Sequence, residues 1–331
     1  MKDFIKSFKQ VIVNNLIIIF SLSLILGLEL FELDYSVYSP GGLINIDNRL
    51  ENAPYKASGS FNMTYVSYRK GSIMNLLIAK VLPTFDIVKN EDITLSNEDI
   101  YDMYKRDDIQ LQSAISNATM VAYAKANKQA NITAEYDYLY YIRPEANSEL
   151  RIGDLIVGCD NNEISNYDEI HSCVQAHNAN EVVEFKVNRN NKVIKAKSTI
   201  GEDGLVGIII TRVYSYDLDP KVTYKYATKE SGSSGGLMLA LSLYNSLIEE
   251  DITKGLKIAG TGTIEPNGTV GEISGVKYKI KGAVKNKVDL FIVPEANYEE
   301  AKQVVEENNF NLKLLKASTF DQVLEDLKNF N

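Results

Sequence analysis

A long apolar run near the start of the chain is its strongest single pattern. Val11 to Leu28 holds eighteen residues without a charge. A helix of that length would reach about 27 Å, close to the thickness of a bilayer's hydrocarbon core. A cleaved signal peptide has a shorter apolar stretch that ends in small residues, whereas this run continues into Glu29 and Leu30. We therefore predict one uncleaved transmembrane helix.

Three lysines, Lys2, Lys6 and Lys9, precede the apolar run. Positive residues beside a membrane helix favour the cytoplasmic side. The predicted protein is a single-pass component of the cell membrane with a cytoplasmic N-terminus, residues 1–30 forming the tail and the anchor. All later residues would lie on the extracytoplasmic side.

Residues 31–131 combine strands with one long helix. Tyr35 to Tyr68 predicts strands, because Leu43 to Ile46 alternates and Phe61 to Tyr68 is rich in aromatic and β-branched residues, with a turn at Ser39-Pro40-Gly41-Gly42. Ser96 to Asn127 carries apolar residues at helical spacing, with a polar break at Arg106-Asp107-Asp108.

Residues 132–200 predict a separate small β unit. Strand-like and helix-like patterns alternate with turn residues along it. The expected elements are a strand at Tyr138–Ile142, the run Leu150–Val157, a helix at Asn166–Ala176, and strands at Val182–Val187 and Val193–Ile200.

Residues 201–331 predict an α/β arrangement. An apolar helix follows Ser234, and a helix capped by Thr319 ends the chain. Between them we expect a strand at Val222–Tyr224, a hairpin of Leu256–Ile264 with Thr269–Ile273, a helix at Val276–Val284 and a buried strand at Val288–Val293. We find no internal repeats.

Composition excludes several classes of function. The 331 residues carry 35 basic and 44 acidic side chains, a net charge of -9, and no basic stripe, which argues against nucleic-acid binding. No G-x-x-x-x-G-K-[ST] loop occurs, so no ATP site is expected. Cys159 and Cys173 lack further ligands for a zinc site, and we expect two buried thiols. No metal or cofactor is predicted.

The stretch Glu230 to Met238 is the most informative for chemistry. Its serines and glycines alone would suit a flexible linker, but it runs directly into an apolar helix. A serine such as Ser234 at a helix N-terminus sits where backbone N–H groups favour negative charge, which suits a nucleophile whose attack creates an oxyanion.

A serine nucleophile also needs a base. Both histidines, His171 and His177, fall in or beside the helix of the small β unit, so a histidine base is not expected. A buried lysine can act as base when its pKa falls. The helix after Gly275 offers Lys277, Lys279 and Lys281, and spacing alone favours Lys279 only slightly.

These motifs resemble the proteolytic domain of the Lon family, in its membrane-anchored, PDZ-containing branch. The family's G-P-S-A-G-like motif, T-G-x-I strand and I-G-G-[LI]-x-x-K segment are similar to Gly232–Gly236, Thr261–Ile264 and Ile273–Lys279. This sequence departs from the family at Ser233, Gly235 and Ser274, where the family has proline, alanine and glycine.

The resemblance implies a Ser-Lys dyad. Ser234 would be the nucleophile and Lys279 the base, with Thr261 supporting the lysine and with Gly232 and Ser233 shaping the nucleophile loop. It also implies a Lon-type α/β (α+β) fold, in which residues 31–131 and 201–331 form one protease domain.

The inserted unit, residues 132–200, resembles a bacterial PDZ domain through its element order and its L-x-x-G-D-x-I run. Such domains bind an extended peptide as an added strand beside a helix. The resemblance implies a groove between Tyr140 and Ile142 on the strand and Ile170 and Val174 on the helix. The segment before that strand, Ala134 to Asp137, lacks glycine, which argues against capture of a free C-terminus.

The expected function is an ATP-independent, membrane-anchored serine endopeptidase that cleaves extended or loosely folded protein segments at the outer membrane face. The alternative is an inactive, anchored peptide-binding adaptor, and the coexistence of Ser234 and Lys279 favours the enzyme. Expected partners are protein or peptide substrates and the membrane, with a homo-oligomer left open.

Overall fold

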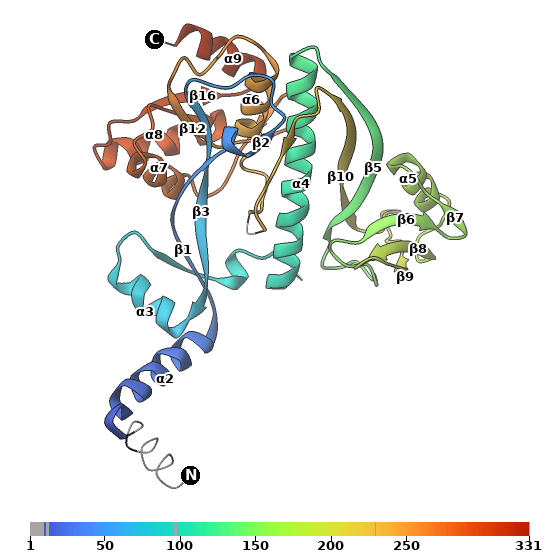
Figure 1. Ribbon diagram of the computed structural model, residues 1–331. Coiled ribbons are helices and arrows are strands. Elements are labelled where there is room, and N and C mark those ends of the chain that lie inside the picture. Colours follow the sequence, from blue (N-terminus) through green and yellow to red (C-terminus); the bar gives the residue numbers. More distant parts are fainter. Residues whose placement is uncertain (1–9, 11–12, 96–97, 229, 331) are drawn as a thin grey trace, which may run out of the picture. The chain divides into compact units, whose positions relative to one another are not determined.

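The computed structural model describes residues 10, 13–95, 98–228 and 230–330 (Figure 1). The chain divides into two compact units. The first comprises residues 1–40 and 66–93, and the second comprises residues 41–65 and 94–331. Two long strands, β1 (Glu32–Asn45) and β3 (Ser60–Ser72), each contribute residues to both units.

The first unit contains the first part of β1 and the last part of β3. It contains α2 (Leu16–Leu30), α3 (Ile73–Val81) and β4 (Asp86–Lys89), which pairs antiparallel with β1. Ser72 begins α3, since its hydroxyl accepts a hydrogen bond from the N–H of Asn75. A single 3-10 turn, Asn90–Asp92, follows β4.

The expected transmembrane helix has only a partial counterpart. Helix α2 begins at Leu16, and Lys2, Lys6, Lys9 and Val11 lie outside the described residues. Within the part of the chain that the structure describes, no helix combines the length and the apolar character needed to cross a bilayer.

The turn expected at Ser39-Pro40-Gly41-Gly42 is wrong, because β1 runs through it without a break. The reason lies in the neighbouring strand. A Cβ on Gly41 would lie 2.1 Å from the backbone oxygen of Tyr65, so glycine here permits close strand contact rather than a reversal. Sequence alone could not distinguish these two uses of glycine.

A sheet covered on both faces forms the centre of the second unit. Its strands follow the order β16-β15-β12-β3, and the three neighbouring pairs are all parallel. The strands not yet given bounds are β12 (Lys257–Gly260), β15 (Leu290–Pro294) and β16 (Lys313–Ala317).

Helices cover the two faces of this sheet with separate apolar cores. On one face, α6 (Gly236–Leu247) and α9 (Phe320–Asn329) pack with Ile258 and Ile292. On the other face, α7 (Val276–Lys285) and α8 (Tyr298–Glu307) pack with Phe291. The predicted α/β arrangement and the Thr319 cap are confirmed, whereas α8 and β16 were not expected.

Small elements complete this unit. A 3-10 turn at Asp47–Arg49 follows β1, and another at Glu295–Asn297 follows β15. The short strands are β2 (Leu50–Glu51) with β11 (Thr223–Tyr224), and β13 (Thr263–Ile264) with β14 (Val270–Gly271). The expected hairpin is therefore β13–β14, while the residues before it join the central sheet as β12.

The helix expected between Ser96 and Asn127 is present as α4 (Ile100–Lys125), which continues through the polar interruption of its apolar stripe. Asp99 caps its start, accepting hydrogen bonds from the N–H groups of Tyr101 and Asp102. Arg106 is buried rather than solvated, because it pairs with the buried carboxylate of Glu98. The ion pair allows a charged side chain to be buried within an otherwise apolar stripe of the helix.

A second sheet holds the predicted small β unit. Its strand order is β10-β5-β6-β8-β9, and β7 (Asn162–Glu163) pairs with β6. The other elements are β5 (Gln129–Ile142), β6 (Leu155–Cys159), α5 (Tyr167–Gln175), β8 (Val182–Arg189), β9 (Lys192–Thr199) and β10 (Ile208–Asp219). The sheet thus extends past residue 200, because β10 pairs with β5 along its whole length.

The two cysteines correct another expectation. Cys159, at the end of β6, and Cys173, in α5, form a disulfide rather than two separate thiols. Their Cα atoms are 6.4 Å apart, within the usual range for such a bond. The two residues are separated by 14 positions, and the β6–β7 hairpin and the turn into α5 bring them together.

Candidate active site

Ser234 lies at the entrance to helix α6, as the sequence predicted. The turn before the helix is formed by a hydrogen bond from the N–H of Gly236 to the carbonyl of Ser233, and Gly235 is the residue before the first helical turn. Gly232 has φ 82°, a left-handed conformation that favours glycine, so its role is to shape the loop. The chain enters the helix with the Ser234 side chain partly exposed.

The loop is held from two sides. The N–H of Gly232 donates to the backbone carbonyl of Asp107 in α4, 2.8 Å away. The N–H of Gly262 donates to the carbonyl of Ser234 at 2.7 Å, and the N–H of Leu237 donates to the carbonyl of Gly262 at 3.0 Å. These bonds fix the backbone on both sides of the Ser234 side chain.

The side chain of Lys279 contacts both Ser234 and Thr261. It is buried, with 3% of its surface exposed, in the first half of α7. Its Nζ donates to the Oγ of Ser234 at 2.6 Å and to the Oγ1 of Thr261 at 2.9 Å. Burial lowers the pKa of the Lys279 amine from its ordinary value to about 7. The amine is therefore half neutral near physiological pH.

Thr261 connects the lysine to the nucleophile loop. Its hydroxyl donates to the backbone carbonyl of Ser234 at 3.0 Å and accepts from the Lys279 amine. The residue is fully buried, immediately after β12. The three side chains named from the sequence thus meet at one place, each from a different element of the α/β core.

The other two lysines of the same helix are placed differently. Lys277 is exposed, with its amine 4.9 Å from the centre of the Tyr278 ring, and Lys281 is partly exposed. Helix α7 carries Lys279 on its inner face with Val276, Ile280 and Ala283. Helical rotation separates Lys277 from this face, as two residues turn a helix by about 200°.

Backbone donors for an oxyanion are also present. Among the residues described by the structure, no hydrogen bond uses the N–H of Ser234 or of Gly235. Both groups lie beside the Ser234 hydroxyl at the positive end of α6. Unpaired N–H groups at such a position can stabilise negative charge that develops on a substrate carbonyl oxygen.

One titratable group beside the loop was missed from the sequence. Asp107 shares the backbone bond to Gly232, and burial raises the pKa of its carboxyl to about 6 although Arg106 opposes that shift. It lies inside the polar break expected in the apolar stripe of this helix. No local pattern signals its burial, which comes from the packing of α4 against the nucleophile loop.

Three of the four residues expected to bind peptide share one apolar core, and the fourth contacts a different element. Ile170 and Val174 belong to the apolar core of the second sheet, 3% and 8% exposed, and Ile142 packs against that core. Tyr140 faces helix α4 instead, where its hydroxyl accepts from Gln110 at 2.7 Å. Strand β5 also pairs with β10, so β10 rather than β5 is the edge strand.

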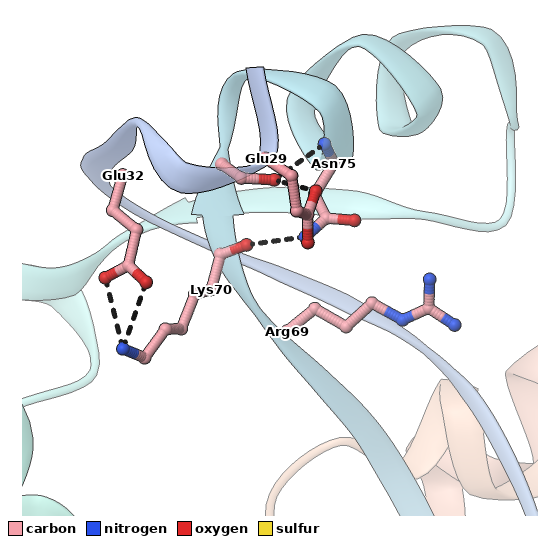
Figure 2. Close-up of a pocket in the computed structure, with 6 residues that line it drawn as sticks. Glu29, Glu32, Arg69, Lys70 and Asn75 are labelled. Carbon is pink, nitrogen blue, oxygen red and sulfur yellow. Dashed lines mark hydrogen bonds and ion pairs between the residues drawn. The ribbon is translucent and has the colours of Figure 1, made fainter. Parts of the chain in front are cut away.

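A hollow in the first unit holds none of the predicted site residues. Figure 2 shows Glu29, Glu32, Arg69, Lys70 and Asn75 around it. The Lys70 amine lies 3.1 Å from both carboxylate oxygens of Glu32, and the Ser72 hydroxyl donates to Glu29 at 2.8 Å. These groups pair with one another, and the Ser72 oxygen also caps α3, so the hollow offers no activated nucleophile.

Known proteins resemble this chain mainly over its last third. Residues 223–329 match the family described as Lon protease (S16) C-terminal proteolytic domain. The Lon protease of Desulfatibacillum aliphaticivorans is 30% identical over 99 residues, which cover 30% of this chain and 12% of that protein. The Lon protease of Campylobacter jejuni is 29% identical over 100 residues, with the same two coverages.

A mitochondrial Lon protease homolog of Phaeodactylum tricornutum is 30% identical over 99 residues, 30% of this chain and 11% of its own length. Among solved structures, the PDZ domain of an SdrC-like protein from Listeria innocua aligns with 23% of this chain and 92% of its own, at 21% identity and a TM-score of 0.21. The chain thus spans about an eighth of the length of the curated relatives. Residues 223–329 are similar to a Lon proteolytic domain, and this similarity supports a serine peptidase.

Proposed function

We propose that the protein is a serine endopeptidase that uses Ser234 as nucleophile and Lys279 as general base. The observation that carries the proposal is the 2.6 Å contact between a buried lysine amine and a serine hydroxyl at a helix N-terminus. Only a neutral amine can accept the serine proton, and a pKa of about 7 makes half of it neutral at pH 7.

The reaction follows from this arrangement. The neutral Lys279 amine takes the hydroxyl proton as Ser234 Oγ attacks the scissile carbonyl, and the N–H groups of Ser234 and Gly235 receive the oxyanion. The resulting ammonium then gives its proton to the leaving amine. Water attacks the acyl-serine ester in the second half, with Lys279 again acting as base.

Thr261 keeps the amine in position through both halves. Its hydroxyl accepts from Lys279 and is itself fixed by donating to the Ser234 carbonyl. A residue that acts through another in this way is a positioning residue. The chain also lacks a phosphate-binding G-x-x-x-x-G-K-[ST] loop, which favours substrates that are already extended or loosely folded.

The same site argues against the alternative function, an inactive adaptor that only binds peptides. A peptidase fold without selection for activity would not need a buried lysine amine, whose burial costs stability. The two functions differ in one measurement. The purified chain should react with a serine-directed fluorophosphonate at Ser234 and cleave an unfolded protein, and Ser234→Ala should do neither. A wild-type chain that binds peptides without cleaving them would support the adaptor.

We infer that the first unit attaches the protein to a membrane. Helix α2 exposes apolar side chains at most of its positions. None of its fifteen residues is buried. Helix α3, which contacts α2, also exposes Leu77 and Val81, at 51% and 79%. Apolar surface of this kind is normally covered by a partner or by lipid.

The N-terminal lysines favour a cytoplasmic N-terminus, and the disulfide favours an oxidising compartment for the rest. External protease added to intact cells should therefore degrade the region after α2. Protection of that region until the cells are lysed would contradict this topology.

Substrate docking is proposed at the edge strand β10. Ile208 and Ile210 at its start pack against the core that includes Ile170 of α5, and this strand is last in the sheet order. The preceding loop contains Gly204 and Gly207, both with φ 76°. The start of β10, before the residues that bond to α4, follows a glycine-containing loop and suits a peptide that adds as a further strand, in place of the groove expected at β5.

A further inference from the structure

An exposed aromatic side chain lies on the same face of β3 as the apolar core beneath α6. Phe61 and Met63 of this strand belong to that core, which also includes α6 residues. Side chains two residues apart on a strand share one face. Tyr65 therefore lies on the same face as Met63, yet 43% of its surface is exposed. The buried core ends between these two residues, and Tyr65 continues its face into solvent.

Met63 locates this face relative to the nucleophile. A Cβ on Gly235 would lie 2.8 Å from the sulfur of Met63, so Met63 lies directly beneath the residue that follows Ser234. Two residues of a strand span about 6.6–6.8 Å. Tyr65 therefore follows Met63 along β3 by about the length of one side chain.

The strand register shows in which direction Tyr65 extends. Strand β12 is parallel to β3, and its last pair joins Gly260 to Met63. Two residues after this pair, Gly262 donates its N–H to the carbonyl of Ser234 at 2.7 Å. If the register is continued, Gly262 is level with Tyr65. The exposed ring thus lies on the strand next to the point where the chain contacts Ser234.

Two glycines of β1 leave room for the Tyr65 ring. A Cβ on Gly42 would lie 3.2 Å from the Tyr65 hydroxyl oxygen and 3.5 Å from a ring carbon, and a Cβ on Gly41 would lie 2.5 Å from another ring carbon. The ring therefore packs against the backbone of β1 at positions without side chains. This contact restricts the ring to one place and leaves the rest of its surface open.

The chemistry of the exposed surface is that of an aromatic ring. The Tyr65 hydroxyl makes no hydrogen bond to any residue that the structure describes. A ring beside a nucleophile favours an aliphatic or aromatic side chain of the substrate, because their contact removes apolar area from water. Recognition would therefore use the ring of Tyr65 and not its hydroxyl.

We propose that Tyr65 is a specificity-determining residue whose ring forms one wall of the substrate site and selects an aliphatic or aromatic side chain close to the scissile bond. The inference rests on the proposed peptidase activity of Ser234 and Lys279, and it adds the class of side chain that this site prefers. Tyr65 takes no part in the proton transfers, so activation of Ser234 does not depend on it.

Matched quenched peptides test the proposal with the full-length chain. A cleavage site in an unfolded protein is first mapped with the wild type, and each position close to the cleaved bond is then varied among Phe, Leu, Ala, Lys and Asp. We expect one position at which Phe and Leu give the highest kcat/KM. Tyr65→Ala should lower kcat/KM for those two peptides by roughly 5–10-fold, the effect of one lost aromatic contact, and change that of the Ala peptide by less than about twofold.

Further variants separate the ring from its hydroxyl and from the fold. Tyr65→Phe should keep the preference, and Tyr65→Glu should shift it from Phe towards Lys at the same position. Tyr55→Ala is the matched control, because Tyr55 is 41% exposed in the same unit. Its N–H donates to the carbonyl of Ser246, near the other end of α6 from Ser234. This variant should keep both the rate and the preference.

Labelling of Ser234 by a fluorophosphonate separates a change in specificity from damage to the site, and every variant should label at the rate of the wild type. The inference is overturned if the wild type shows no apolar preference at any position, or if Tyr65→Ala leaves that preference unchanged while cleavage still requires Ser234. It is also overturned if Tyr65→Ala lowers labelling and the cleavage of all peptides equally. A wild type that neither labels nor cleaves would instead overturn the proposed function, and this inference with it.

Discussion

The amine of Lys279 lies 2.6 Å from the hydroxyl of Ser234, although the residues are 45 positions apart in sequence. The contact is possible because the start of α6 and the inner face of α7 meet at the end of β12, where Thr261 follows the strand. Lys279 is nearly fully buried there, and its environment contains the two hydroxyl acceptors of Ser234 and Thr261. This is the arrangement a lysine base needs.

Lysine substitutions should separate the base from its neighbours on the helix. Lys279→Ala removes the amine that contacts Ser234, so cleavage and labelling by a fluorophosphonate should both fall by at least about 1,000-fold, within the range for loss of a nucleophile's base. Lys277→Ala is the matched control, because that side chain is exposed. It should retain activity within about twofold. If Lys277→Ala were inactive and Lys279→Ala active, the assignment of Lys279 as the base would be wrong.

Burial of Lys279 should also be visible in stability. Its pKa is about 7 in the folded chain and about 10.4 when unfolded, so the unfolded state binds more protons between those values. The stability of the wild type should therefore rise with pH from about 7 to about 10.4, by on the order of 5 kcal/mol in total, and the full cost of burial should apply below pH 7.

Lys279→Met removes this titration while filling a similar volume. Urea unfolding of both proteins from pH 6 to pH 10 gives the difference directly. The methionine variant should be more stable at pH 6, and its advantage should shrink as pH rises. Parallel pH profiles for the two proteins would mean that Lys279 is not buried as an amine.

Thr261 offers a test of positioning rather than of chemistry. Thr261→Val keeps the shape of a fully buried side chain but removes both of its hydrogen bonds. Loss of a buried partner typically costs 1–3 kcal/mol, so kcat should fall by roughly 5–150-fold with little change in KM. Thr261→Ser keeps the hydroxyl and should restore most of the rate. Equal losses for valine and serine would point to packing instead.

The structural features that the sequence predicted correctly are those that depend on residues close together in the chain. The helix after Ser234, the Thr319 cap and the β8–β9 hairpin follow from residues that lie next to one another, and all three occur in the structure. Ser234 and Lys279 were named from motifs, since spacing favoured Lys279 over Lys277 only slightly. The structure adds their contact, which depends on the order of strands in the central sheet.

Predictions that required non-local contacts were the ones that failed. Gly41 suggested a turn because sequence does not show that Tyr65 lies against it. Arg106 was expected only as a polar break in the apolar stripe of α4, because sequence does not show that it is buried against Glu98, eight residues away. The peptide groove was assigned to β5 because the strand that covers it, β10, follows 66 residues after the end of β5 (Ile142 to Ile208).

The proposed docking edge makes a prediction about β10. The carbonyl of Arg212 accepts from Ser113 of α4, and the N–H of Tyr214 donates to Ser116, so these backbone groups point away from β5. Ile210, two residues earlier, presents its N–H on the same edge because strand groups alternate. We therefore expect this N–H to pair with an added peptide strand.

Ile210→Pro removes that donor, whereas Ile210→Ala keeps it and removes a similar amount of apolar contact. The proline variant should raise KM for a long unfolded substrate, by about 5–10-fold for one lost hydrogen bond, and should leave turnover of a short fluorogenic peptide unchanged. The alanine variant should show less of this effect. If both variants lose activity on both substrates alike, β10 supports the fold and does not dock peptides.

Gly235 provides the last prediction, because Lon-like sequences are expected to carry alanine at this position. A Cβ on Gly235 would lie 2.8 Å from the sulfur of Met63, which is 8% exposed in the core beneath the nucleophile loop. Met63 therefore occupies the space that an alanine methyl would take. Gly235→Ala alone should destabilise the protein by about 1 kcal/mol, the lower end of the range for overpacking, because the contacted sulfur belongs to a flexible side chain.

Truncating Met63 should remove the destabilisation caused by Gly235→Ala. Met63→Ala alone should destabilise by about 2–5 kcal/mol through the cavity it leaves, and Gly235→Ala added to it should cost nothing further or regain some stability. Urea unfolding of the four proteins gives the coupling energy between the two sites. Additive changes would show that Met63 does not replace the missing methyl, and the loop would then have another reason to contain glycine next to Ser234.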